Sequence, residues 1–154
     1  TIGGPTAAFR NVISGHNGTG LAVTAADVTV ECNYFGTDAT GTAALPNVTG
    51  LNVTSGTNVV ARSNLFSFNA VGVAAGDPGD LLLRDNSIAG NTDGVSWNSA
   101  AAAALNATDN WWGDASGPTH PGNPAGIGDT ATETNPGPIL YKPWLAAPPA
   151  PCGP

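Results

Sequence analysis

Short apolar segments alternate with polar corners along this chain, at a spacing close to 22 residues. The pattern of an asparagine, any residue and then a large apolar residue recurs five times, at Asn11, Asn33, Asn64, Asn86 and Asn110. The steps between these asparagines are 22, 31, 22 and 24 residues. The long step contains the turn-rich segment 36–46, so we predict an inserted loop there.

Each repeat predicts three short strands. Apolar residues recur five and three residues before each later asparagine, an alternation that would turn one face of a short strand inward. The pairs are Val28/Val30, Val59/Ala61, Leu81/Leu83 and Leu105/Ala107. After each asparagine and a turn, a second apolar segment follows, at residues 20–23, 50–53, 70–73 and 94–97. Alternation over so few residues is typical of strands, and helical spacing is missing. The pattern predicts an all-β fold.

Constant spacing with no room for crossover helices predicts a parallel coil in which each turn stacks on the last. A sandwich would need longer strands and reversing hairpins. In such a stack each corner asparagine would adopt the left-handed conformation, and its amide would bond the same amide one coil away. We expect Asn17, Asn69 and Asn91 to form a second ladder. The alternative, ordinary turn asparagines in an irregular β fold, leaves the 22-residue step unexplained.

The two ends of the chain differ. Ten of the thirteen prolines lie in residues 118–154, so we divide the chain into coils at 1–117 and a Pro-rich cap and tail at 118–154. Trp111, Trp112 and Trp144 would cover the open end of the stack without offering a new strand for pairing. The N-terminal end has no such cover, so self-association through this edge is one candidate interaction.

Three segments resemble the right-handed parallel β-helix repeat proteins with pectate-lyase-like coils. They are residues 10–15 (RNVISG), 33–43 (NYFGTDATGTA) and 110–118 (NWWGDASGP), and the closing segment of that family corresponds to Pro143-Trp144-Leu145. The resemblance implies a right-handed single-stranded parallel β-helix of about four coils, from a secreted or surface protein of bacteria or archaea. That coil serves lyases, glycosidases, adhesins and stalks alike, so it implies no single activity.

Charge and composition limit the partners. The formal net charge is −7 with only four Lys and Arg residues, which is unsuited to nucleic acid or an anionic membrane. The longest apolar run, residues 100–105, is far below the roughly 20 residues that span a bilayer. The chain opens without Met, so we expect a mature form or a fragment of an exported protein. Cys32 and Cys152 fit either one long-range disulfide or two free thiols.

Candidate catalytic acids are few. Asp85 and Asp109 each precede a ladder asparagine and would be neighbours on adjacent coils, with Arg84 and Arg62 nearby. A solvated surface pair is the simpler reading of these charges. Asp93, in Asn91-Thr92-Asp93-Gly94, resembles the first polygalacturonase motif, but Ser96 replaces the second acid and no Gly-His-Gly follows.

Candidate binding residues are equally few. Trp97, Trp111 and Trp112 could stack on sugar rings, although aromatic residues more often close an apolar core. Asp38, with Thr37 and Thr40, is the one candidate for a loose calcium site, and a tight loop without metal is the simpler reading. No other cofactor is expected.

We therefore expect a non-catalytic structural or adhesin-like module of an extracellular or cell-surface protein, with glycans or surface ligands as partners. The alternative is a polysaccharide lyase or glycoside hydrolase of the pectate-lyase-like type, or a fragment of one. The missing stacked acids favour the module.

Overall fold

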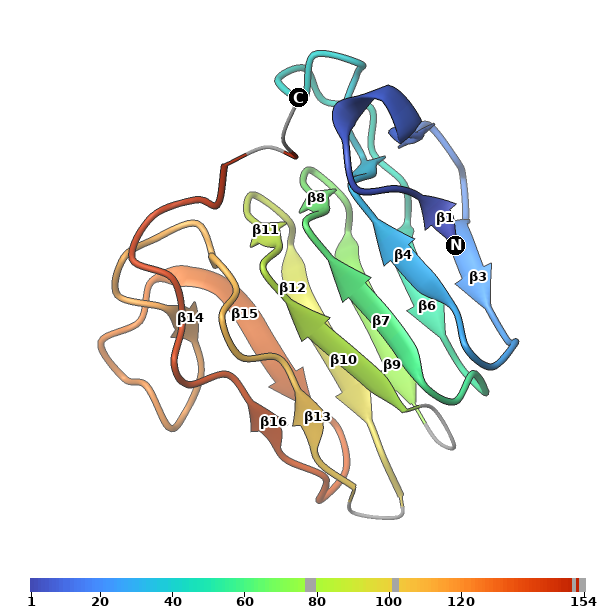
Figure 1. The fold of residues 1–154 in the computed structure, drawn as a ribbon. Helices are drawn as coiled ribbons and strands as arrows, with labels where there is room; N and C mark the ends of the chain where they lie inside the picture. The colour runs from blue at the N-terminus through green and yellow to red at the C-terminus, as the bar shows by residue number, and fades with distance from the viewer. Residues whose placement is uncertain (77–79, 101–102, 151, 153–154) are drawn as a thin grey trace.

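A computed structural model describes residues 1–76, 80–100, 103–150 and 152. The protein is all-β, and its strands form three sheets with parallel neighbours (Figure 1). Sheet A contains β1 (Ile2–Gly3), β4 (Thr29–Glu31), β7 (Val59–Arg62), β10 (Leu81–Arg84), β13 (Leu105–Asn106) and β16 (Ile139–Leu140). Sheet B contains β2 (Val12–Ile13), β5 (Tyr34–Phe35), β8 (Leu65–Phe66) and β11 (Ser87–Ile88). Sheet C contains β3 (Thr19–Val23), β6 (Thr49–Val53), β9 (Val71–Gly76), β12 (Asp93–Asn98), β15 (Gly128–Glu133) and β14 (Pro118–Thr119).

From β1 to β12 the chain visits sheets A, B and C in turn and then repeats, and after β13 in sheet A it continues with β14 and β15 in sheet C and β16 in sheet A. Three short strands per repeat were predicted, and this order confirms them. The predicted alternation in sheet A is also confirmed, because Val30 pairs with Ala61 and Leu83 pairs with Ala61 in register. The arrangement is compatible with a β-helix.

The core lies between the three sheets and is built from columns of equivalent residues. Phe35, Phe66 and Ile88 form the column of sheet B, and all three are fully buried. The rings of Phe35 and Phe66 stack with centroids 4.7 Å apart. Because each inward position repeats once per coil, every coil buries its apolar face only against its neighbours.

Two insertions interrupt the spacing. The predicted loop 36–46 leaves the stack between β5 and β6 and closes on itself through an antiparallel bridge between Thr37 and Ala44. A second insertion, containing the short 3₁₀ helix η1 (Ala7–Phe9), lies between β1 and β2. This insertion makes the Ile2–Val30 step longer than the 22-residue Asn11–Asn33 step, and the sequence pattern did not reveal it.

The Pro-rich segment differs from expectation, because it does offer strands for pairing. β15 pairs with β12, so that Ala131 continues the column of Val95, and β16 pairs with β13, so that Ile139 continues that of Leu105. The expectation that this segment offers no new strand for pairing is therefore wrong. Within the described ranges, no helix is long and apolar enough to cross a membrane.

Candidate functional site

A ladder of asparagine amides runs along the corner between sheets A and B. The Nδ2 of each of Asn11, Asn33, Asn64 and Asn86 donates to the Oδ1 of the next ladder asparagine, at 2.9, 3.2, 3.1 and 2.9 Å. The same Oδ1 also accepts the backbone N–H of the preceding ladder residue. The predicted ladder, with Asn110 as its last member, is confirmed.

Backbone carbonyls complete the amide bonding of the ladder. Asn64 Nδ2 donates to Val30 O at 2.9 Å, and Asn86 Nδ2 donates to Ala61 O at 3.0 Å. Asn33, Asn86 and Asn110 are fully buried, so these bonds replace water that cannot reach the amides. The ladder is a structural device that fixes the register of neighbouring coils.

The left-handed residue at this corner is not the asparagine, as the sequence suggested, but the residue before it. For four of the five ladder asparagines the residue before has a positive φ, namely Cys32, Ser63, Asp85 and Asp109, at 63°, 54°, 55° and 58°. Arg10, before Asn11, is extended, with a φ of −62°. The ladder asparagines themselves are absent from this set. The asparagine is therefore required for its amide and not for its backbone.

A second ladder runs between sheets B and C, with one member different from the prediction. Asn47 Nδ2 donates to Asn69 Oδ1 at 2.9 Å, and Asn69 Nδ2 donates to Asn91 Oδ1 at 3.0 Å. Asn17 is exposed, and the backbone N–H of His16 occupies the first place by donating to Asn47 Oδ1. The prediction is thus confirmed for Asn69 and Asn91 and wrong for Asn17.

Asp129 ends this second ladder. Its Oδ2 accepts the Nδ2 and backbone N–H of Asn91 at 2.8 and 2.9 Å, and its Oδ1 accepts the N–H of Gly90 at 2.9 Å. Burial is the main cause that raises the pKa of Asp129, the nearby Asp93 adds to it, and the bonds from Asn91 and Gly90 oppose it. A carboxylate suits this place because it only accepts.

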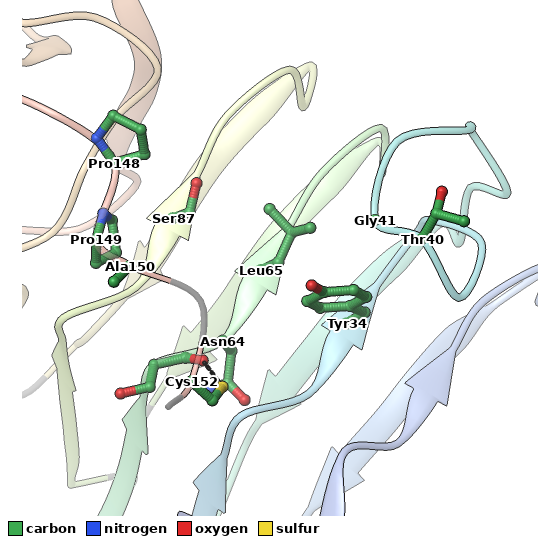
Figure 2. A pocket seen from close by; sticks show the side chains of 11 residues that line it. Tyr34, Thr40, Gly41, Asn64, Leu65, Ser87, Pro148, Pro149, Ala150 and Cys152 are labelled. Carbon is green, nitrogen blue, oxygen red and sulfur yellow. Dashed lines mark hydrogen bonds between the residues drawn. The ribbon is translucent and has the colours of Figure 1, made fainter. Parts of the chain in front are cut away.

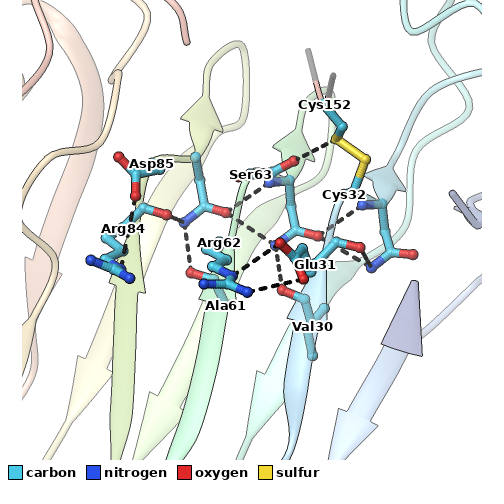
Figure 3. Close-up of polar contacts among 12 residues, drawn as sticks. Val30, Glu31, Cys32, Ala61, Arg62, Ser63, Arg84, Asp85 and Cys152 are labelled. Atoms are coloured by element: carbon cyan, nitrogen blue, oxygen red, sulfur yellow. Dashed lines mark hydrogen bonds and ion pairs between the residues drawn. A yellow bond between two sulfur atoms is a disulfide. The ribbon is translucent and has the colours of Figure 1, made fainter. Parts of the chain in front are cut away.

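Asp85 and Asp109 are neighbours on adjacent coils, as predicted, since Asp85 N–H donates to Asp109 O at 2.8 Å. Both occupy the left-handed corner position, which aspartate tolerates better than most residues. Asp85 lies 3.8 Å from Arg84 Nε, and both side chains are exposed (Figure 3). The backbone conformation thus explains these acids without any chemistry.

Arg62 pairs with an acid of the neighbouring strand. Its Nε and Nη2 lie 3.1 and 3.2 Å from the two carboxylate oxygens of Glu31, across the β4–β7 pairing. This two-point contact holds Arg62 away from Asp85 and Asp109.

Asp93 begins β12 and faces the adjacent β15. Its Oδ1 accepts the hydroxyls of Thr130 and Thr132 at 2.5 and 3.0 Å. These two threonines line a hollow of about 510 Å³ together with His120 and Glu133. Asp93 is therefore the acid candidate that lies beside a cavity.

His120 is held from both sides in this hollow. Its Nδ1 accepts the Gly122 N–H at 2.9 Å, and its Nε2 lies 3.5 Å from Glu133 Oε1. Glu133 also accepts the N–H of Ile139. Because both ring nitrogens are engaged, His120 offers no free lone pair as a base, as expected for a loop residue.

The tryptophan candidates lie mostly inside. Trp97 and Trp112 are 1% and 0% exposed, so their rings are not available to a sugar and both candidates are corrected. Trp97 continues the inward column of β12, and its Nε1 donates to Ala103 O at 3.1 Å. Trp111 is half-buried and bridges to Ser87 on the outer face next to sheet B.

Asp38 organises its own loop. Its Oδ1 accepts the backbone N–H groups of Thr42 and Ala43, both at 3.1 Å, and the Thr40 hydroxyl at 2.8 Å. The Thr40 bond is the largest of the causes that lower the pKa of Asp38. Among the residues that the structure describes, no three His, Cys, Asp or Glu side chains are grouped to hold a metal ion.

The strongest candidate for a ligand site is a groove of about 420 Å³ on the outer face of sheet B (Figure 2). Tyr34, Leu65 and Ser87, in register on β5, β8 and β11, form its floor. Thr40 and Gly41 of the inserted loop line one side, and Pro148, Pro149 and Ala150 of the C-terminal segment line the other. None of the described residues that line the groove carries a charge, and the charge beside its floor is the Arg10 guanidinium, 4.1 Å from the centroid of the Tyr34 ring.

A disulfide fastens the C-terminal segment beside this groove. Cys152 is bonded to Cys32, the left-handed corner residue that precedes Asn33, with Cα atoms 5.7 Å apart (Figure 3). Of the two states that the sequence left open, the structure contains the disulfide. The groove is formed by residues that are far apart in the sequence, so no local sequence motif predicts it.

No family model, curated protein or solved structure matches this chain.

Proposed function

We propose that the chain is a right-handed, single-stranded parallel β-helix of about four coils with a Pro- and Trp-rich C-terminal cap at residues 118–154. Right-handed connection between parallel strands of one sheet is the strong general rule, which supports the hand. Trp112, Tyr141 and Trp144 gather with β16 near the end of the stack, which supports the cap.

This β-helix serves as a rigid structural or adhesin-like module of an exported surface protein. The observation that carries the proposal is the pair of continuous amide ladders, which fix every coil to the next and leave little freedom for a moving active site. The Cys32–Cys152 disulfide supports an extracellular or cell-surface location, because such bonds persist in oxidising compartments.

The groove on sheet B is the place where this module would contact a glycan. The described lining residues carry no charge, which suits a neutral sugar, and aromatic rings bind the apolar faces of pyranoses. The Arg10 guanidinium covers one face of the half-buried Tyr34 ring, 4.1 Å from its centroid, so a sugar would contact the remaining exposed part of the ring. The chain's net charge of −7 opposes acidic glycans.

A calorimetric titration against a panel of neutral and acidic oligosaccharides tests glycan binding. Tyr34→Ala should abolish binding of the neutral sugars while Tyr34→Phe retains it, and Phe68→Ala, on another exposed surface, serves as control. Binding that survives Tyr34→Ala, or that prefers acidic sugars, would contradict the assignment of the groove.

A second candidate function is polysaccharide cleavage, favoured by one observation. Asp93 and Asp129 influence each other electrostatically, and Asp93 binds two threonines that line the hollow of about 510 Å³. Assays for reducing ends and unsaturated products, with and without calcium, test this alternative. Cleavage that disappears in Asp93→Asn would replace the structural module by an enzyme.

A further inference from the structure

The N-terminal end of the stack presents the free edges of all three sheets. β1, β2 and β3 are each the terminal strand of their sheet. Val23 O accepts the N–H of Thr54 next to β6, so Val23 faces the neighbouring coil. Since successive residues of a parallel strand bond to opposite sides, the N–H and C=O of Ala22 point to the free side.

The core is also incompletely covered at this end. Ile2, Ile13 and Leu21 are half-buried, whereas their partners one coil further, Val30, Phe35 and Leu51, are fully buried. Phe9 is 61% exposed and Val12 is 43% exposed beside them. The apolar columns therefore stop at a surface that would be interior in any later coil.

The first ladder has a direction, and its first member is left half-bonded. Each later ladder asparagine accepts with Oδ1 from the coil before it, and Asn33 also donates from Nδ2 to Ile2 O in that coil. Asn11 Oδ1 accepts no hydrogen bond from the described part of the chain, and Asn11 is exposed. Asn11 thus offers the acceptor that every inner coil uses to join its predecessor.

We propose that the N-terminal end is a docking surface for one further parallel β-coil, whose corner residue donates a backbone N–H and a side-chain amide to Asn11 Oδ1. We identify the occupant as a coil because this end presents the same groups with which the coils of Asn33, Asn64 and Asn86 bind the coil before them. Backbone pairing at β1, β2 and β3, apolar contact at Ile13 and amide donation to Asn11 are the three parts of this joint.

The C-terminal end of a second copy does not fit this description. There Asn110 Nδ2 already donates to Leu83 O, Ala107 O and Thr108 O at 2.8, 2.8 and 3.1 Å. β16 and the Pro-rich segment also follow Asn110 at that end of the stack (Figure 1). If two copies docked through their N-terminal ends, the Oδ1 acceptor of Asn11 in one copy would face the same acceptor in the other.

The test is a fusion that places a second copy of residues 60–81 directly before Thr1. The 22-residue unit keeps the Ala61–Leu83 step, so the added asparagine copied from Asn64 comes above Asn11. The urea midpoint of the fusion should exceed that of the 154-residue chain by about 1 M. The exchange of the Ala22 amide should slow about tenfold or more, because it becomes paired.

Two controls make the result decisive. In the first control, the same fusion carries Asn64→Leu in the added copy only, and it should lose most of the increase in urea midpoint. In the second, residues 82–105 are fused in place of 60–81, and this fusion should show the increase even if the first added coil folds poorly. If neither fusion moves the midpoint or protects Ala22, the proposal is overturned. It is equally overturned if the unfused chain dimerises in light scattering and Ala22→Pro abolishes the dimer, because a second copy then occupies this end.

Discussion

At the scale of single residues, the corner between sheets A and B uses two adjacent positions, one for the left-handed backbone conformation and one for side-chain hydrogen bonding. The left-handed backbone falls on Cys32, Ser63, Asp85 or Asp109, and the hydrogen bonding falls on the asparagine that follows. The 22-residue recurrence predicted which asparagines stack, because a buried amide needs the same partner in every coil. It could not predict the left-handed position, because residues of several types fill that place.

Replacement of one inner asparagine should destabilise the whole stack. Asn64→Leu removes the Oδ1 that accepts the backbone N–H and Nδ2 of Asn33, in a site that is 2% exposed. It also removes one of the two donors to Asn86 Oδ1 and the amide donor to Val30 O. We expect the free energy of unfolding to fall by about 3–5 kcal/mol, measured by urea denaturation.

The matched control is Asn17→Leu, at an exposed asparagine outside both ladders. Its effect should stay within about 0.5 kcal/mol. Asn123 in the tail is unsuitable as a control because its Nδ2 donates to Ser116 O and Pro118 O, both at 2.9 Å. Equal shifts for Asn64→Leu and Asn17→Leu would refute the ladder.

Asp38 should make the inserted loop sensitive to acid. Its pKa lies below the ordinary aspartate value, first because of the Thr40 hydroxyl bond, so the stabilisation is complete above the ordinary pKa and is lost as pH falls through the lowered one. The protection factors of the Thr42 and Ala43 amides, measured by NMR relative to the intrinsic exchange rate at each pH, should therefore fall on acidification. In Asp38→Ala the same amides should exchange fast throughout, and protection that ignores pH in the parent chain would exclude this role.

At the scale of elements, sheet C approaches sheet B through a column of glycines. Gly20, Gly50, Gly72 and Gly94 occupy equivalent places near the start of β3, β6, β9 and β12. A Cβ on Gly50 would lie 2.6 Å from Gly72 O and 3.3 Å from the Cβ of Phe35. The column lets two sheets meet at a narrow corner.

Gly50→Ala should therefore cost about 1–3 kcal/mol of unfolding free energy, because the backbone oxygen and the buried ring cannot both move away. Thermal denaturation followed by circular dichroism measures the loss. Gly18→Ala is the control, since nothing lies within 4 Å of its added Cβ. An unchanged midpoint for Gly50→Ala would mean that the corner relaxes without cost.

The sequence predicted strands where large apolar residues alternate and missed those where they do not. Val59/Ala61 and Leu81/Leu83 reveal β7 and β10, because their inward positions are apolar. β15 reads Gly-Asp-Thr-Ala-Thr-Glu, and Ala131 is its single buried residue, so it lacks a strand signal. β15 is placed by its pairing with β12 and by the hydrogen bonds of Thr130 to Asp93 and of Asp129 to Asn91. These partners are far apart in the sequence and meet only in the folded chain.

At the scale of the whole molecule, the Cys32–Cys152 bond joins the end of the chain to the second coil. The sequence separation of 120 residues means that the bond spans the intervening coils. Terminal coils of a repeat protein contact only one neighbour and open first, so a bond from the end to an inner coil opposes this opening. Two cysteines in the sequence allowed either this disulfide or two free thiols. The groove on sheet B could not be predicted, because three segments that are distant in the sequence form it.

Removal of this disulfide should lower the free energy of unfolding by about 4–5 kcal/mol, the loss expected from chain entropy for a loop of this size. Cys152→Ser and the parent chain in dithiothreitol should show the same lowered urea midpoint. The reductant should leave the Cys152→Ser midpoint unmoved, which separates loss of the bond from general effects of the reagent. A parent midpoint that does not respond to reduction would show that the coils hold the end without it.

The one-way bonding of the ladders gives the molecule an electrical axis. Apart from Asn110, every stacked amide donates one N–H toward the C-terminal end, to the next side chain of its ladder. This component of the side-chain dipoles adds along the stack as peptide dipoles do along an α-helix. Asp129 places a negative charge at the positive pole of one such column, as acidic residues do at the first turn of a helix. A lengthened version of this protein should therefore orient more strongly in an applied field with each coil added.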